Sequence, residues 1–130
     1  MSENLDLVRS IYADWERGDF SRADWADPEI DFEIIGGPTE YRCHGVPEMA
    51  RRVREFLTTW KGYRTQAEEY RELDYERILV LTRDTARGRG SGVDTMQMRA
   101  NVLHLQGGRV TRIATYWDRD RALADLGLEG

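Results

Sequence analysis

Two acidic residues within an apolar stretch are the first candidates for chemistry. Asp31 and Glu33 alternate with Ile30, Phe32 and Ile34, and this period of two is typical of a β-strand. A carboxylate walled by apolar side chains has its charged form desolvated and its pKa raised, which suits a base that takes a proton from carbon. The same alternation also fits a solvated face opposite the apolar residues, so both orientations of Glu33 stay open.

The other reactive side chains lack the spacing that their chemistry needs. Cys43 and His44 are adjacent in an extended segment, where successive side chains point to opposite faces, so they cannot form a thiolate dyad. His44 and His104 do not have the spacing of metal ligands. The glycine-rich pattern over 88–92 lies between two predicted strands and not between a strand and a helix, unlike a dinucleotide-binding loop. We therefore expect no cofactor and no metal.

Helical periodicity and capping residues predict the helices that position these groups. The first helix spans 5–17, and its apolar face is formed by Leu5, Val8, Tyr12 and Trp15. A short second helix is predicted from Ser21 to the residue before Pro28. A third runs over 47–61, and Asp118 caps a short terminal helix.

Alternation and turn residues predict the strands, at 30–34, 63–74, 77–87, 95–105 and 109–117. The stretch 63–74 is ambiguous, because part of it has a helix-forming composition, but its context favours a polar edge strand. Helices gathered early in the chain and four consecutive hairpin-joined strands predict an α+β fold with an antiparallel sheet.

The composition excludes several classes of protein. Among 130 residues, 24 are acidic and 19 basic, giving a net charge of −5; Lys61 is the single lysine, so 18 of the basic residues are arginine. An acidic total disfavours a nucleic-acid binder, and the longest aliphatic run, 78–81, is too short to cross a bilayer. The first residues do not resemble a signal peptide, and Cys43 stands alone. We expect a cytoplasmic protein with one domain over 1–130 and with neither nucleic acid nor membrane as a partner.

Several motifs resemble those of a known family. They are the stretches 11–20 (IYADWERGDF), 27–33 (DPEIDFE), 88–93 (GRGSGV) and 116–119 (YWDR) with Ala122-Leu123 behind. In these stretches and in the order of its elements, the chain resembles the family of nuclear transport factor 2, ketosteroid isomerase and the SnoaL-like polyketide cyclases. The resemblance covers nearly the whole chain. It implies a curved sheet wrapped around the N-terminal helices, a cystatin-like cone whose apolar pocket binds a small hydrophobic ligand, and a homodimer.

The resemblance also implies roles for particular residues. Glu33 falls where ketosteroid isomerase has its general base, and Asn101 falls where that enzyme has a protonated aspartate that donates to the developing oxyanion. An amide can donate the same hydrogen bond, although a buried Asn101 satisfied by backbone is the competing interpretation. The tyrosine donor of that site aligns with Ile11, and Tyr12 is expected to point elsewhere on the helix, so steroid isomerase activity is not expected.

Arg83 is the third catalytic candidate. If the strands 77–87 and 95–105 pair around the glycine loop, Arg83 lies opposite Asn101 on the same face. The chain is similar here to limonene epoxide hydrolase, which has an arginine between two carboxylates, but Thr85 and Thr115 occupy the carboxylate positions. Arg83 could anchor an enolate or a carboxylate, or it could form a structural ion pair with Glu33.

The hairpin over 106–108 decides which side chains share a face with Asn101. A three-residue turn places Asn101 with residues 113, 115 and 117, whereas a two-residue turn would bring 114 and 116 to that face; the resemblance favours the first. The expected substrate-binding residues are Trp15, Phe56, Trp60, Ile113, Thr115 and Trp117, although an aromatic stripe is more often plain core.

Three functions follow from these features. The first is a cyclase, isomerase or dehydratase in which Glu33 abstracts a proton while Asn101 and Arg83 stabilise the enolate. The second is a binding protein that uses the same pocket without chemistry. The third is a dimerisation module whose pocket is vestigial.

Overall fold

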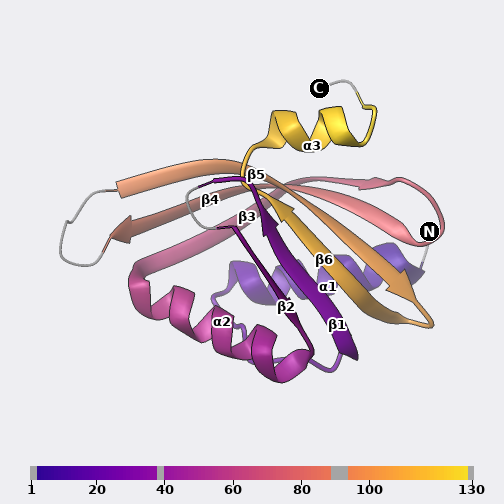
Figure 1. Ribbon diagram of the computed structural model, residues 1–130, viewed down its shortest axis with the longest axis horizontal. Helices are drawn as coiled ribbons and strands as arrows, with labels where there is room; N and C mark the ends of the chain where they lie inside the picture. Colours follow the sequence, from indigo (N-terminus) through magenta and orange to yellow (C-terminus); the bar gives the residue numbers. More distant parts are fainter. Residues whose placement is uncertain (1–2, 38–39, 89–93, 129–130) are drawn as a thin grey trace.

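The structure is a computed structural model that describes residues 3–37, 40–88 and 94–128. Its helices are α1 (Glu3–Glu16), α2 (Val46–Thr59) and α3 (Arg119–Asp125). Its strands are β1 (Ala26–Ile35), β2 (Tyr41–His44), β3 (Trp60–Glu72), β4 (Arg77–Gly88), β5 (Asp94–Gln106) and β6 (Arg109–Tyr116). All six strands form one curved sheet in the order β2-β1-β6-β5-β4-β3 (Figure 1).

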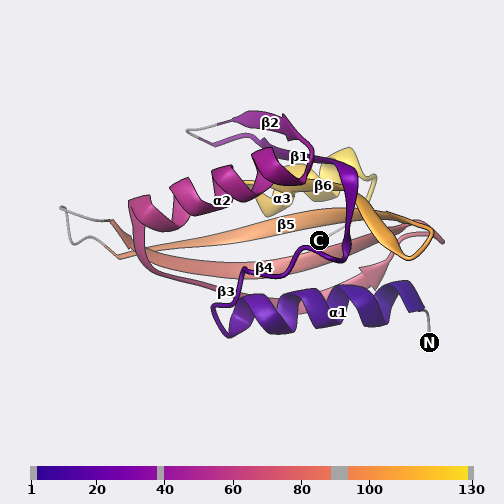
Figure 2. The ribbon, with the colours of Figure 1, turned by 90° about the horizontal axis from the view of Figure 1, so that it is seen from below.

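The two longer helices lie on one face of the sheet, and α3 lies on the other (Figure 2). The predicted α+β class is therefore confirmed. The sheet is mixed and not purely antiparallel, because β1 pairs in parallel with β6, whereas the other strand pairs are antiparallel.

Local sequence explains where the helices begin and end. Gly18, with φ of +81°, follows the last turn of α1, and this left-handed conformation is one that glycine adopts without strain. Pro47 lies in the first turn of α2, where its missing N–H costs nothing. The Asp118 side chain accepts a hydrogen bond from the backbone N–H of Asp120 and so caps α3 as predicted.

The short helix predicted from Ser21 is wrong. The Asp19 carboxylate accepts hydrogen bonds from both the backbone N–H and the hydroxyl of Ser21, at 3.0 and 2.6 Å, and these bonds hold a turn. The chain then passes directly into β1 at Ala26. Ser21 thus stabilises a turn and does not cap a helix.

Two apolar cores lie on opposite faces of the sheet. The concave face packs against α1 and α2 around Val8, Ile11, Ile30 and Ile113. The convex face packs against α3, and its buried residues are Leu79, Leu81, Ala100, Val102, Ala114, Ala122 and Leu123. Adjacent residues of β4 and β5 thus enter different cores, as the period of two requires.

The β5–β6 hairpin combines a short turn with a bulge. Gly107 and Gly108, both with positive φ, form a two-residue turn between Gln106 and Arg109. The register then shifts between His104 and Leu105, so that Thr111 is an extra residue on β6. Because of this extra residue, Asn101 shares a face with the same β6 side chains as it would after a three-residue turn. Asn101 pairs with residue 115.

Candidate functional site

A cavity of about 600 Å³ lies between the concave face of the sheet, α1, α2 and the loop over 18–25. Aromatic rings supply much of its wall: Tyr12, Trp15, Phe20, Trp25, Phe32, Tyr41, Phe56, Tyr63 and Trp117. Several of these rings contact one another edge to face or stacked, including Trp15 against Phe20, with centroids 6.0 Å apart. The wall is therefore apolar and held in shape by ring contacts.

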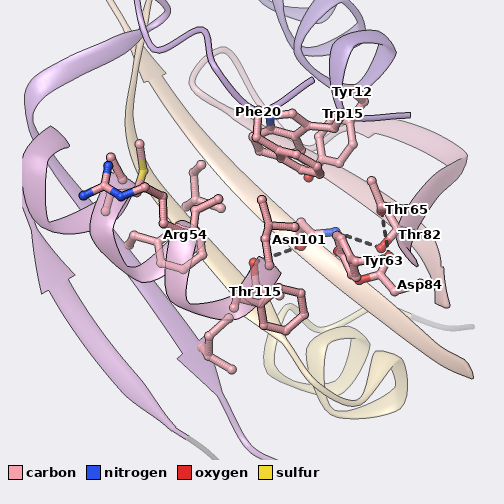
Figure 3. Close-up of a pocket in the computed structure, with 18 of the residues that line it drawn as sticks. Tyr12, Trp15, Phe20, Arg54, Tyr63, Thr65, Thr82, Asp84, Asn101 and Thr115 are labelled. Carbon is pink, nitrogen blue, oxygen red and sulfur yellow. Dashed lines mark hydrogen bonds between the residues drawn. The ribbon is translucent and has the colours of Figure 1, made fainter. Parts of the chain in front are cut away.

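A row of buried polar side chains crosses the floor of this cavity (Figure 3). The Asn101 amide donates to the Thr82 hydroxyl and to the Val80 carbonyl oxygen, each at 3.2 Å. Its own oxygen accepts from the Thr115 hydroxyl at 2.9 Å. Asn101 thus lines the cavity as expected, but its hydrogen bonds are made within the protein, which agrees with the competing interpretation of a satisfied buried amide.

Asp84 is a buried carboxylate in the cavity wall, on the strand next to Asn101. It accepts hydrogen bonds from the Thr65 hydroxyl at 2.6 Å and from the Tyr63 hydroxyl at 3.0 Å. Burial raises the pKa of Tyr63, and the neighbouring charge of Asp84 raises it further, so this phenol stays protonated and donates. Asp84 was not among the predicted site residues, although the alternation of Thr82 and Asp84 after the aliphatic run indicates an inward-facing carboxylate.

Arg99 brings a cation to the same wall. Its side chain is only 11% exposed, and its Cζ lies 4.6 Å from the centroid of the Trp117 ring. Its Nε lies 3.5 Å from an Asp84 oxygen, which is ion-pair distance without a hydrogen bond. That Nε is buried and donates to no acceptor in residues 3–37, 40–88 or 94–128.

Tyr12 lines the cavity, so the expectation that it points elsewhere is wrong. It is 2% exposed, and its hydroxyl has no hydrogen-bond partner within the part of the protein that the structure describes. Burial raises its pKa strongly, and the nearby Asp84 adds to the shift. The hydroxyl is therefore a neutral donor that donates to no protein group among the described residues. The apolar stripe of α1 already predicted this orientation, and the alignment of the resemblance misplaced it.

Most of the expected substrate-binding residues do line the cavity. These are Trp15, Phe56, Ile113, Thr115 and Trp117. Trp60 begins β3, and its side chain lies outside the part of the chain whose side chains the structure describes.

Glu33 does not line the cavity, and its expected place there is wrong. Phe32 and Ile34 face the cavity, so Glu33 between them faces the other side of the sheet. It is nevertheless only 6% exposed, because Arg42 and Arg112 both form ion pairs with it, the first at 3.0 Å. Burial acts to raise the pKa of Glu33, but the hydrogen bonds and charges of the two arginines outweigh it and lower the pKa.

Arg83 also faces away from the cavity. The β4–β5 register pairs it with Met98 and pairs Asn101 with Val80, a shift of three residues from the expected pairing. An odd shift moves a side chain to the opposite face of the sheet. Arg83 is exposed and forms an ion pair with Glu68 at 3.8 Å. The three predicted catalytic residues therefore do not meet.

Cys43 and His44 diverge as expected. Cys43 is buried, whereas His44 is exposed and its ring nitrogens lie 2.8 and 2.6 Å from carboxylate oxygens of Asp31 and Glu29. Across residues 3–37, 40–88 and 94–128, no group of three or more histidine, cysteine or acidic side chains could hold a metal ion. Within the same ranges, no helix is long and apolar enough to span a membrane.

Known structures share this fold, although no protein-family model matches the chain and no curated protein matches it in sequence. An NTF2-like protein from Burkholderia thailandensis superposes with a TM-score of 0.81 at 19% identity, over 99% of this chain and 100% of that one. A SnoaL-like protein from Jannaschia sp. CCS1 gives 0.76 at 12% identity, over 98% and 94%. A protein with a ketosteroid isomerase-like fold from Catenulispora acidiphila, in complex with trimethylamine, gives 0.72 at 11%, over 95% and 94%.

These likenesses establish the architecture. The chain has the NTF2-like and SnoaL-like cone fold that the sequence motifs predicted. At such low identity they establish the fold alone, and one fold of this kind supports many functions.

Proposed function

We propose that this chain binds a small, mostly apolar molecule in the cavity enclosed by α1, α2 and the concave face of the sheet. The observation that carries the proposal is a cavity of about 600 Å³ with aromatic walls and a few buried polar groups. Pockets for small molecules have roughly 300–1,000 Å³ and this same combination of apolar lining and sparse polar contacts. The trimethylamine bound to the Catenulispora acidiphila protein supports a ligand-binding use of the fold.

The size of the cavity argues against the vestigial-pocket hypothesis. Protein interiors are close-packed, with few voids larger than a water molecule. A fold kept only for dimerisation would be free to fill such a space with larger side chains, and each would add stability. The homodimer and the cytoplasmic location stay predictions, and sedimentation velocity would test the former.

A neutral fluorescent probe tests the binding function. N-phenyl-1-naphthylamine is apolar and brightens when it leaves water, so it should bind the wild-type cavity and be displaced by a screened ligand. Val53, on the cavity side of α2, is the site for Val53→Trp, which fills the space. Glu55→Trp adds the same ring on the exposed side of the helix as a control. Binding that survives Val53→Trp, or no binding by the wild type, would refute the proposal.

A second candidate is proton-transfer chemistry of the cyclase or isomerase type. The observation that favours it is that Asp84 and Tyr12 both line one cavity, and that the Tyr12 hydroxyl has no acceptor among the described residues. A carboxylate can take a proton from a carbon next to a carbonyl, while a phenol donates a hydrogen bond to the enolate oxygen.

Deuterium exchange tests this second candidate without knowledge of the substrate. The protein is mixed with 2-tetralone, a bicyclic ketone, in D₂O, and loss of the proton signals next to its carbonyl is followed by NMR. Wild type should accelerate exchange, and Asp84→Asn should abolish the acceleration while it still binds the naphthylamine probe. Equal exchange in both proteins would remove Asp84 as the base.

A further inference from the structure

The guanidinium of Arg99 lacks partners that its burial should demand. An arginine carries five N–H donors and accepts nothing, and removing such a group from water is costly unless its donors are used. Arg99 has one ion-pair contact at 3.5 Å, to Asp84, and the face of the Trp117 ring. Its buried Nε makes no hydrogen bond. The cation is therefore held in the cavity wall with unused donors.

Asp84 does not consume those donors. The Thr65 hydroxyl donates to one carboxylate oxygen and the Tyr63 hydroxyl donates to the other. Both hydroxyls are closer to Asp84 than Arg99 is. The Asp84 carboxylate thus balances the charge of Arg99 without a hydrogen bond. The N–H groups of the planar Arg99 guanidinium stay free for another acceptor.

The other arginines of the described lining are placed differently. Arg22 is about half exposed and pairs with Asp14 and Asp24, at 3.0 and 3.1 Å. Arg54 is exposed, and its guanidinium points away from Asn101 (Figure 3). Arg99 is accordingly the cation that a molecule inside the cavity would meet.

We propose that Arg99 is the anchor for an acidic oxygen of the ligand, so that the cavity selects an apolar, ring-containing molecule with one oxyanion such as a carboxylate or an ionised enol. The inference rests on the proposed binding function and names its ligand class. The oxyanion accepts from the free guanidinium N–H groups, and the rings of the ligand lie along the aromatic wall that includes Trp117 and Phe56. A guanidinium in an apolar wall discriminates strongly between charged and neutral forms of one skeleton, because water competes poorly there.

Two dyes with one skeleton test this inference. 8-Anilino-1-naphthalenesulfonate carries an oxyanion, and N-phenyl-1-naphthylamine is the same molecule without it. Fluorescence titrations give both affinities for wild type, Arg99→Met and Arg83→Met, the last of which removes an exposed arginine from the other face of the same sheet. Arg99→Met should weaken the sulfonate about tenfold or more, as loss of a charged hydrogen bond does, and leave the neutral dye within about twofold. Arg83→Met should change neither.

A second variant tests the inference if Arg99→Met does not fold. Asp84→Asn removes the neighbouring negative charge, so it should raise the affinity for the sulfonate several-fold relative to the affinity for the neutral dye. An unchanged ratio of the two affinities in Arg99→Met, or weaker sulfonate binding relative to the neutral dye in Asp84→Asn, would overturn the inference while leaving the binding function intact. Failure of both dyes to bind wild type would instead overturn the proposed function, and this inference with it.

Discussion

The unpartnered hydroxyl of Tyr12 leads to a prediction that runs against the usual effect of a core substitution. Most point mutants are destabilised, by about 1 kcal/mol on average. Tyr12→Phe keeps the ring contacts with Trp15 and Tyr70, whose centroids are 4.8 and 6.2 Å away, and removes only the hydroxyl. A buried polar group without a partner costs about 1–3 kcal/mol. We therefore expect Tyr12→Phe to be more stable than wild type by about 1 kcal/mol or more.

Tyr63→Phe is the matched control. It makes the same chemical change but should lower the free energy of unfolding, whereas Tyr12→Phe should raise it. The Tyr63 hydroxyl donates to Asp84 at 3.0 Å, and its ring packs against Phe56 with centroids 4.8 Å apart. Removing the hydroxyl leaves a buried carboxylate one donor short. A hydrogen bond to a charged group contributes about 1.5–3 kcal/mol, so this variant should lose at least about 1.5 kcal/mol.

Urea unfolding followed by far-UV circular dichroism measures both variants. The two should differ by at least about 2.5 kcal/mol, which at a slope of about 1.5 kcal/mol/M separates their midpoints by about 1.7 M or more. The slopes themselves should not change, since neither substitution alters the surface exposed on unfolding. If Tyr12→Phe loses as much stability as Tyr63→Phe, the Tyr12 hydroxyl forms a stabilising hydrogen bond, contrary to this prediction.

Two further predictions concern the sheet and its edge. Because the pKa of Glu33 is lowered, its stabilisation is present above the ordinary carboxyl pKa and is lost as the pH falls through the lowered value. Glu33→Gln should thus be about 1 kcal/mol less stable than wild type at pH 7. In urea titrations this difference in stability should shrink toward pH 3, and a difference that does not depend on pH would contradict the prediction. Gly37 and Gly62 both have positive φ, but only at Gly37 would a Cβ meet the Trp117 ring, at 2.6 Å. Gly62→Ala should lower the free energy of unfolding by about 1–2 kcal/mol, whereas Gly37→Ala should lower it further and also weaken dye binding. Equal melting temperatures for the two variants would contradict this prediction.

Patterns that depend on a few neighbouring residues predicted the structure well. The stripe of α1 and the Asp118 cap of α3 are decided within one or two turns, and both are confirmed. The glycine pair at 107–108 predicted a hairpin, but the bulge at Thr111 depends on how β6 fits between β1 and β5, which no local pattern encodes. Asn101 reached its predicted face because turn and bulge compensate.

Features that depend on register were not predictable from these patterns. Arg83 was misplaced because the pairing of β4 with β5 is set over long strands, and an error of three residues reverses the face. The alternation around Glu33 correctly placed Phe32 on the cavity side of the sheet. The alignment with the family wrongly placed Glu33 there. The alternation of Thr82 and Asp84 marks Asp84 as inward-facing, but its hydrogen bonds with Tyr63 and Thr65, some twenty residues earlier, depend on the register of β3 with β4.

The parallel pairing of β1 with β6 imposes an order on folding during synthesis. The ribosome delivers the β1–β2 ribbon, residues 26–44, long before residues 109–116 appear. Until then, one edge of β1 exposes unpaired backbone N–H and C=O groups, a template for aggregation. Strands β3 to β6 pair with their neighbours in sequence and can form hairpin by hairpin, so the ribbon joins them last (Figure 1). A nascent chain stalled before residue 116 thus carries an open sheet edge and an unfinished cavity.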